Sequence, residues 1–181
     1  SIGNIAYERW NDQLFATNLE DGQIYRIDAG GSIVETYDPW TADNGTPGIV
    51  TQDERIWGIG INKEGSDIKV YFPRITGSTR TIYSITLLNG AFPAPGSEII
   101  EIANLPGVQN IVSDLAFSSN GQELLIAERG GPHTSKVQSY TLSGTSWTAN
   151  LQYFVGGHAS TGNDGENSAG GVDFAYTEIN G

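Results

Sequence analysis

The sequence predicts an all-β protein made of four-stranded antiparallel blades, the architecture of a partial β-propeller. Three observations lead to this prediction. A pattern of apolar strands recurs at an interval of 54 to 59 residues, turn-forming dipeptides separate the strands, and no helical periodicity extends beyond a single turn. A unit of four strands repeated in this way is typical of propeller blades. A β-sandwich is the alternative, because it also contains many short strands, although it lacks such internal self-similarity.

Each unit opens with a short apolar strand that surrounds one small residue and is followed by a polar turn. The small residues are Ala6, Gly60, Ala116 and Ala175, which are separated by 54, 56 and 59 residues. The opening strands that they predict span residues 4–7, 58–61, 114–117 and 173–176. The loops between units are rich in Gly, Asn, Asp, Thr and Pro, which accounts for an interval longer than that of most propeller blades.

The later part of each unit repeats as well. Alternating apolar and polar residues predict a half-buried strand at 23–28, 81–86 and 136–141. Further strands follow at 32–37, 98–103 and 147–155, and dipeptides such as Asp21-Gly22 and Asn89-Gly90 suit tight hairpins. The predicted blades therefore span 1–55, 56–111 and 112–170, and residues 171–181 begin a fourth.

Two stretches, 14–28 and 112–129, resemble the blades of NHL-like and SMP-30-like propellers, especially the propeller regions of large exported bacterial surface proteins. The resemblance implies a secreted or cell-surface location and a non-catalytic binding or structural module. It also leaves open a metal-dependent lactonase or esterase of the SMP-30-like kind. No Gly-x-Ser-x-Gly motif or other nucleophile constellation is present in the sequence, which favours the binding module.

Composition narrows the function classes further. The 181 residues include 21 acidic and nine basic residues, for a net charge of −12, and the basic residues are scattered. Nucleic acid is therefore not an expected partner, because phosphate binding needs clustered cations. Cysteine is absent, which excludes disulfides and thiolate metal sites, and no apolar run is long enough for a membrane span. Because methionine is also absent, we expect the chain to be a piece of a longer protein.

Three blades and one extra strand would leave two blade faces bare. If each face exposed roughly 500 Å² of apolar surface, about 12 kcal/mol of hydrophobic stabilisation per face would be lost, at about 25 cal/mol/Å². This loss is comparable to the stability of a typical domain, about 5 to 15 kcal/mol. We therefore expect further blades of the same chain, a second copy or a protein partner to cover these faces, with a glycan or peptide as a possible ligand.

The aligned opening strands predict a metal site in the central channel. Two residues before each small residue stand Asn4, Gly58, Asp114 and Asp173. Since opening strands are innermost in a propeller, we expect oxygen atoms of Asn4, Asp114 and Asp173 to hold a hard cation such as Ca²⁺. The alternative is that these side chains hydrogen-bond to neighbouring backbone, as Asp and Asn at strand starts commonly do.

Two further candidates lie in loops. Asp164 and Glu166 belong to an Asn-Asp-Gly-Glu sequence that is similar to calcium-binding loops, although it lacks the spacing of an EF-hand, and a solvated connection is the alternative. Trp40, in an Asp-Pro-Trp-Thr loop, is the tryptophan that we expect to be exposed and to stack on a sugar or peptide ligand.

Overall fold

The computed structural model describes residues 1–40, 49–106, 111–129, 136–154 and 171–174. They form three separate four-stranded antiparallel sheets, each with its strands in sequence order. The first blade consists of β1 (Ile2–Glu8), β2 (Gln13–Asn18), β3 (Ile24–Ile27) and β4 (Ile33–Tyr37). The second consists of β5 (Gly60–Glu64), β6 (Asp67–Thr76), β7 (Thr79–Thr86) and β8 (Ile99–Ile102). The third consists of β9 (Ile111–Phe117), β10 (Glu123–Arg129), β11 (Lys136–Ser143) and β12 (Ser146–Phe154).

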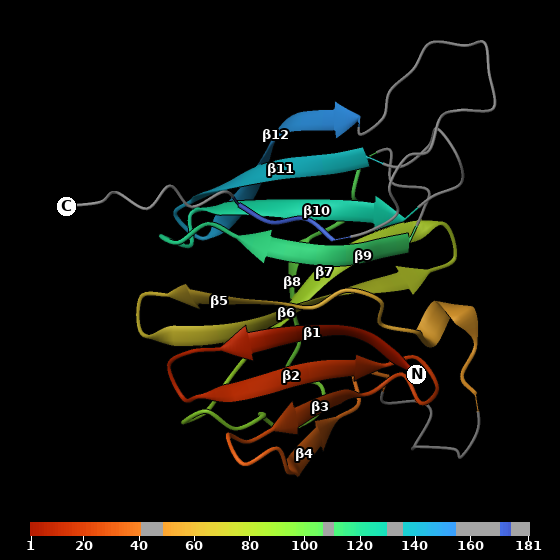
Figure 1. Cartoon of the computed structure of the whole chain (residues 1–181). Helices are drawn as coiled ribbons and strands as arrows, with labels where there is room; N and C mark the ends of the chain where they lie inside the picture. Colours follow the sequence, from red (N-terminus) through yellow and green to blue (C-terminus); the bar gives the residue numbers. More distant parts are fainter. Residues whose placement is uncertain (41–48, 107–110, 130–135, 155–170, 175–181) are drawn as a thin grey trace.

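The three blades stand side by side, with their opening strands β1, β5 and β9 adjacent and running in the same direction (Figure 1). This arrangement confirms the predicted all-β class and the partial propeller of four-stranded blades. In the described ranges the one helical segment is a single 3₁₀ turn, Gln52–Glu54, and no helix there has the length and apolar character needed to cross a membrane.

The opening strands differ from their predicted bounds. β1 and β9 begin two or three residues earlier than predicted, at Ile2 and Ile111. β5 begins at Gly60 instead of residue 58, because the backbone at Gly58 leaves the sheet and lies against β9. A Cβ atom added to Gly58 would lie 3.1 Å from the backbone nitrogen of Asp114, so glycine permits this close approach. Residues 171–174, predicted to enter a fourth opening strand, run beside the third blade and have no strand pairing in the described part of the chain (Figure 1).

The blades are joined by two apolar cores. The core between blades one and two combines Phe15, Ile24 and Tyr37 with residues of β6 and β7, all of them buried. The core between blades two and three joins side chains of β6, β7 and β8 to those of β9 to β12. The residues of this second core are Tyr71, Ile82, Ile102, Leu105, Val112, Leu115, Leu124, Ile126, Tyr140, Leu142 and Trp147.

Strand β6 contributes to both cores because successive side chains of a strand point to opposite faces. Val70 and Phe72 pack toward blade one, whereas Tyr71 packs toward blade three. All three side chains have no solvent-exposed surface. The continuous apolar run in β6 is therefore the sequence pattern of a strand buried on both faces.

The outermost faces of blades one and three carry exposed apolar side chains. In β1, Ile5 and Tyr7 alternate with Ala6, which packs toward blade two, and they are 50% and 57% exposed. In β12, Leu151 and Tyr153 are 60% and 48% exposed. That further blades, a second copy or a protein partner cover these faces stays a prediction.

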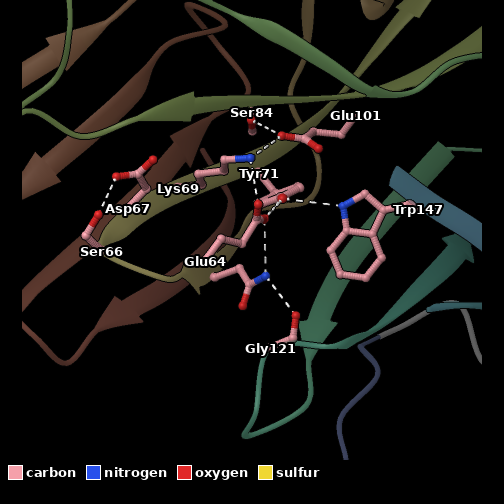
Figure 2. Close-up of polar contacts among 10 residues, drawn as sticks. Glu64, Ser66, Asp67, Lys69, Tyr71, Ser84, Glu101, Gly121 and Trp147 are labelled. Carbon is pink, nitrogen blue, oxygen red and sulfur yellow. Dashed lines mark hydrogen bonds and ion pairs between the residues drawn. The ribbon is translucent and has the colours of Figure 1, made fainter. Parts of the chain in front are cut away.

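A polar network accompanies the second core (Figure 2). Lys69 forms ion pairs with Glu64 (2.7 Å) and Glu101 (2.9 Å), and Tyr71 donates its hydroxyl hydrogen bond to Glu64. The indole nitrogen of Trp147 donates to the Tyr71 hydroxyl at 3.4 Å, so the network reaches blade three. Burial by itself lowers the pKa of Lys69, but the hydrogen bonds and charges of the two glutamates raise it above its ordinary value.

Trp147→Ala is expected to lower the free energy of unfolding by about 3 to 5 kcal/mol, the usual cost of removing a buried aromatic side chain. Trp147 is 9% exposed and packs against the rings of Tyr71 and Phe117. The matched control is Tyr153→Ala in the same strand, on the outer face, where we expect a loss below about 1 kcal/mol. Urea unfolding followed by circular dichroism measures both, and equal losses would contradict the assignment of the core.

The buried tyrosines predict a loss of stability in strong alkali. Burial, and then the charge of Glu128, raises the pKa of Tyr140 to about 12, and burial with a glutamate hydrogen bond raises the pKa of Tyr37 and Tyr71 still further. The folded state keeps these protons above pH 10, where the unfolded chain loses them, so stability is complete below pH 10 and falls as the pH rises toward about 12.

Urea unfolding at a series of alkaline pH values, with tyrosinate absorbance recorded in parallel, measures this effect. Tyr140→Phe should make the decline shallower, because that position no longer releases a proton on unfolding. A decline of unchanged slope in this variant would show that Tyr140 does not contribute.

Candidate functional site

The start of the inner strands brings together two of the three predicted channel residues. The side-chain nitrogen of Asn4 donates to Oδ1 of Asp114 at 2.7 Å and to the backbone oxygen of Ser113 at 3.2 Å. β1 and β9 each contain a bulge at this point, which turns the backbone at equivalent places in the two blades. Gly58 has no side chain and its backbone lies against Asp114, so it puts no side chain in the way of this contact.

Asp173 lies elsewhere. Its carboxylate accepts a hydrogen bond from the backbone of Phe174, and it lines a cavity of about 600 Å³ on the outer face of blade three. The backbone nitrogen of Val172 instead donates to Oδ2 of Asp114 at 2.8 Å. The chain segment predicted to supply the third ligand thus reaches Asp114 through its backbone.

Asn4 and Asp114 line a polar cavity of about 410 Å³. Its wall also includes Ser113, Trp57 and Arg129, whose guanidinium carbon lies 5.6 Å from the centroid of the Trp57 ring. The indole nitrogen of Trp57 is buried and has no hydrogen-bond partner among the described residues. An acceptor in this cavity would satisfy that nitrogen.

The hydrogen bonds show what a cation at Asp114 would have to displace. Oδ1 of Asp114 accepts from Asn4 and from the backbone of Leu115, and Oδ2 accepts from Val172. Asn4 presents its nitrogen to this carboxylate, whereas Ca²⁺ requires oxygen ligands. Within the described ranges, no group of three or more His, Cys, Asp or Glu residues is placed to hold a metal ion. Asp164 and Glu166 lie outside the described residues, and the Ca²⁺ site stays a prediction.

Asp114→Asn separates the structural role of this carboxylate from a metal role. The amide loses one acceptor and the negative charge, so we expect a loss of about 1 to 3 kcal/mol in unfolding free energy. If the carboxylate serves only these hydrogen bonds, the unfolding midpoint of the unsubstituted chain will be the same in Ca²⁺ and in chelator. A midpoint that rises with Ca²⁺ in the unsubstituted chain but not in Asp114→Asn would establish the metal site instead.

The opposite end of the inner strands forms a second pocket, of about 390 Å³. It lies where the β1–β2, β5–β6 and β9–β10 hairpins turn, on the side to which β1, β5 and β9 point (Figure 1). Each blade supplies residues to this pocket from the same positions, when positions are counted from the small residue of each repeat (Ala6, Gly60 and Ala116). One residue after it stand Tyr7, Ile61 and Phe117, and three residues after it stand Arg9, Lys63 and Ser119.

Trp10 forms part of this pocket and is held by the buried carboxylate of Glu8. Glu8 is completely buried and accepts hydrogen bonds from the backbone nitrogens of Trp10 (2.6 Å) and Asn11 (3.1 Å). The side chains of Asn11 and Gln13 donate to it at 2.8 and 3.0 Å. Four hydrogen bonds to one carboxylate fix the hairpin, so the Trp10 backbone is anchored while its side chain stays 38% exposed.

Two cations lie against the Trp10 ring. The guanidinium carbon of Arg9 is 4.7 Å from the ring centroid, and the Lys63 nitrogen is 5.4 Å from it. Both distances lie within the range of cation–π attraction. Among the described residues that line the pocket there is no Asp or Glu, although Tyr7 donates its hydroxyl to Asp12 nearby at 2.8 Å. For a chain of net charge −12, this pocket is locally cationic.

Trp40 is not the exposed tryptophan that we expected. Its ring is half-buried, its indole nitrogen donates to the backbone of Glu54 at 2.8 Å, and the Arg74 guanidinium covers it at 4.0 Å. The flanking Asp38 also accepts a hydrogen bond from the Trp40 backbone, which draws the loop in. A ligand-binding role for Trp40 stays a prediction.

The second pocket was not predicted from the sequence, although a signal for it existed. Asn4 and Asp114 were selected by aligning the repeats and comparing the residues two positions before each small residue. Extended three residues after it, the same alignment brings Arg9 and Lys63 to one position. Trp10 lies next to Arg9, so an aromatic residue beside paired cations was visible in the repeat.

Comparisons with known proteins assign the chain to no family. No family model matches the chain, and no curated protein matches it. Among solved structures, the chain is similar to one described as the complex of KlAtg21 with coiled-coil of AgAtg16, with a TM-score of 0.49 and 11% sequence identity. The match covers 84% of this chain and spans 42% of the length of that one.

Proposed function

We propose that this chain is a non-catalytic binding module of a secreted or cell-surface protein, and that its recognition site is the pocket at the hairpin ends of β1–β2, β5–β6 and β9–β10. One observation carries the proposal: three consecutive blades contribute equivalent positions to a single concave site that contains a partly exposed tryptophan. Loops that are positioned by a rigid scaffold are common places for binding residues.

The construction of the pocket supports recognition more than chemistry. Its described lining consists of aromatic and apolar residues, two cations, and the hydroxyl and amide groups of Ser118, Ser119, Asn62 and Asn120. Such groups orient a ligand by stacking and by hydrogen bonds. Trp10 is pre-positioned by Glu8, which reduces the ordering cost of binding.

The central experiment screens the 181-residue chain against arrays of glycans and peptides, then repeats the screen with Trp10→Ala. We expect the substitution to weaken any ligand that uses the pocket by at least about tenfold, since an anchoring aromatic typically contributes more than about 1.4 kcal/mol. Tyr153→Ala is the matched control, because it removes an exposed aromatic ring from the outer face of blade three.

Glu8→Gln tests the positioning role of the buried carboxylate. Gln keeps one acceptor oxygen but loses the charge, so the Trp10 hairpin should loosen and binding should weaken with Trp10 still present. Ligands that bind unchanged to both Trp10→Ala and Glu8→Gln would place recognition elsewhere on the chain and remove the basis of the proposal.

A further inference from the structure

We infer that the pocket at the hairpin ends binds an oxyanion group, such as a carboxylate, sulfate or phosphate, between Arg9 and Lys63. This inference rests on the proposed binding function and adds the chemical class of the ligand. The structure assigns it through the placement of charge, the geometry around Trp10 and the repetition of one position in two blades.

The charges of Arg9 and Lys63 are not neutralised by acidic side chains. Neither residue forms an ion pair with any described residue of the chain. In contrast, Arg26, Lys69 and Lys136 each lie within 4 Å of a glutamate. Carboxylates outnumber cations by 21 to nine, yet both of these cations lie against one ring and form no ion pair with the described residues.

The Trp10 ring keeps the two cations together. Both lie within 6 Å of its centroid, and the ring attracts each of them while their mutual repulsion persists. An oxyanion between them would relieve this repulsion and accept charge-assisted hydrogen bonds from both. A cationic ligand would add to the repulsion, and a neutral ligand would leave it unchanged.

The surrounding residues supply further donors for such a group. Asn62 is not one of them, because it is 2% exposed and its side-chain nitrogen donates to the backbone of Gly121 at 3.1 Å and to Glu64 at 3.4 Å, which fixes the wall between blades two and three. Ser119 and Asn120 are exposed at the rim of the pocket. Three carboxylates lie near its wall. Glu8 is buried under four donors, Asp12 accepts from the Tyr7 hydroxyl, and Glu64 accepts from Lys69, Tyr71 and Asn62.

The test is a titration of the ¹⁵N-labelled 181-residue chain with sodium sulfate, phosphate and acetate, with sodium chloride added to hold ionic strength constant. We expect saturable shifts of the Trp10 indole N–H signal, assigned with Trp10→Phe, and of the backbone amides of Arg9 and Lys63. The three anions distinguish the sources: tighter binding of acetate indicates a carboxylate, and tighter binding of sulfate or phosphate indicates a tetrahedral group.

The decisive variant is Arg9→Gln combined with Lys63→Gln, in which we expect the apparent affinity to fall at least about tenfold. The control is Arg80→Gln, which removes one positive charge at the start of β7, at the opposite end of blade two, and should leave binding unchanged. A fold check by circular dichroism on each variant separates loss of binding from loss of structure.

Two results would overturn the inference. Shifts that are linear in anion concentration and spread over the chain would show a general salt effect, and saturable shifts that persist in the double glutamine variant would place the anion elsewhere. If a neutral glycan or peptide binds in a Trp10-dependent manner while no anion does, the anion inference fails and the binding module stands. If no ligand from the arrays or among the anions perturbs Trp10, both fail.

Discussion

The packing of β6 against both of its neighbours is the interaction on which the rest of the structure depends. A four-stranded sheet has two faces, and blade two buries both because Val70 and Phe72 pack on one side and Tyr71 on the other. Burial of three such side chains contributes roughly 5 to 9 kcal/mol by transfer alone. These two cores hold together blades that share no strand pairing, since no described strand of one blade pairs with a strand of another.

The stacking of blades also creates the polar sites, because it aligns the ends of the inner strands. At the end where these strands begin, close backbone contact at Gly58 lets Asn4 of blade one reach Asp114 of blade three. At the end where they stop, the turns of three hairpins converge on one pocket. Neither site exists within a single blade, so both depend on the apolar cores that hold the blades in register.

Most of the fold was predictable because it follows from local periodicity. Alternation and turn dipeptides predicted the fourth strands of the blades to within one residue at each end, as in β4 and β12. The bounds of β5 were not predictable, because its first residues are drawn away by β9, which is distant in sequence. Trp40 was misplaced for a similar reason, since its partners Glu54 and Arg74 come from other segments.

For the candidate sites as well, the sequence predicted positions within a repeat but not the contacts between segments that are distant in sequence. Repeat alignment placed Asn4 and Asp114 at equivalent positions of two blades, but it could not show that they contact each other through a direct hydrogen bond of the amide nitrogen. It also could not show that Glu8 is fully buried, because an isolated glutamate next to an arginine is most simply expected at the surface.

Equivalent positions of the three hairpins differ in what their side chains do. The residues one position after each small residue are all apolar or aromatic, which suits the shared packing around the inner strands. The next position holds Glu8, Asn62 and Ser118, three different polar residues that each hydrogen-bond within or between hairpins. The third holds Arg9, Lys63 and Ser119, which face the pocket and satisfy no comparable structural need. The scaffold therefore uses the first two positions to fix the hairpins, and the third is the position to which the proposed binding function assigns ligand choice.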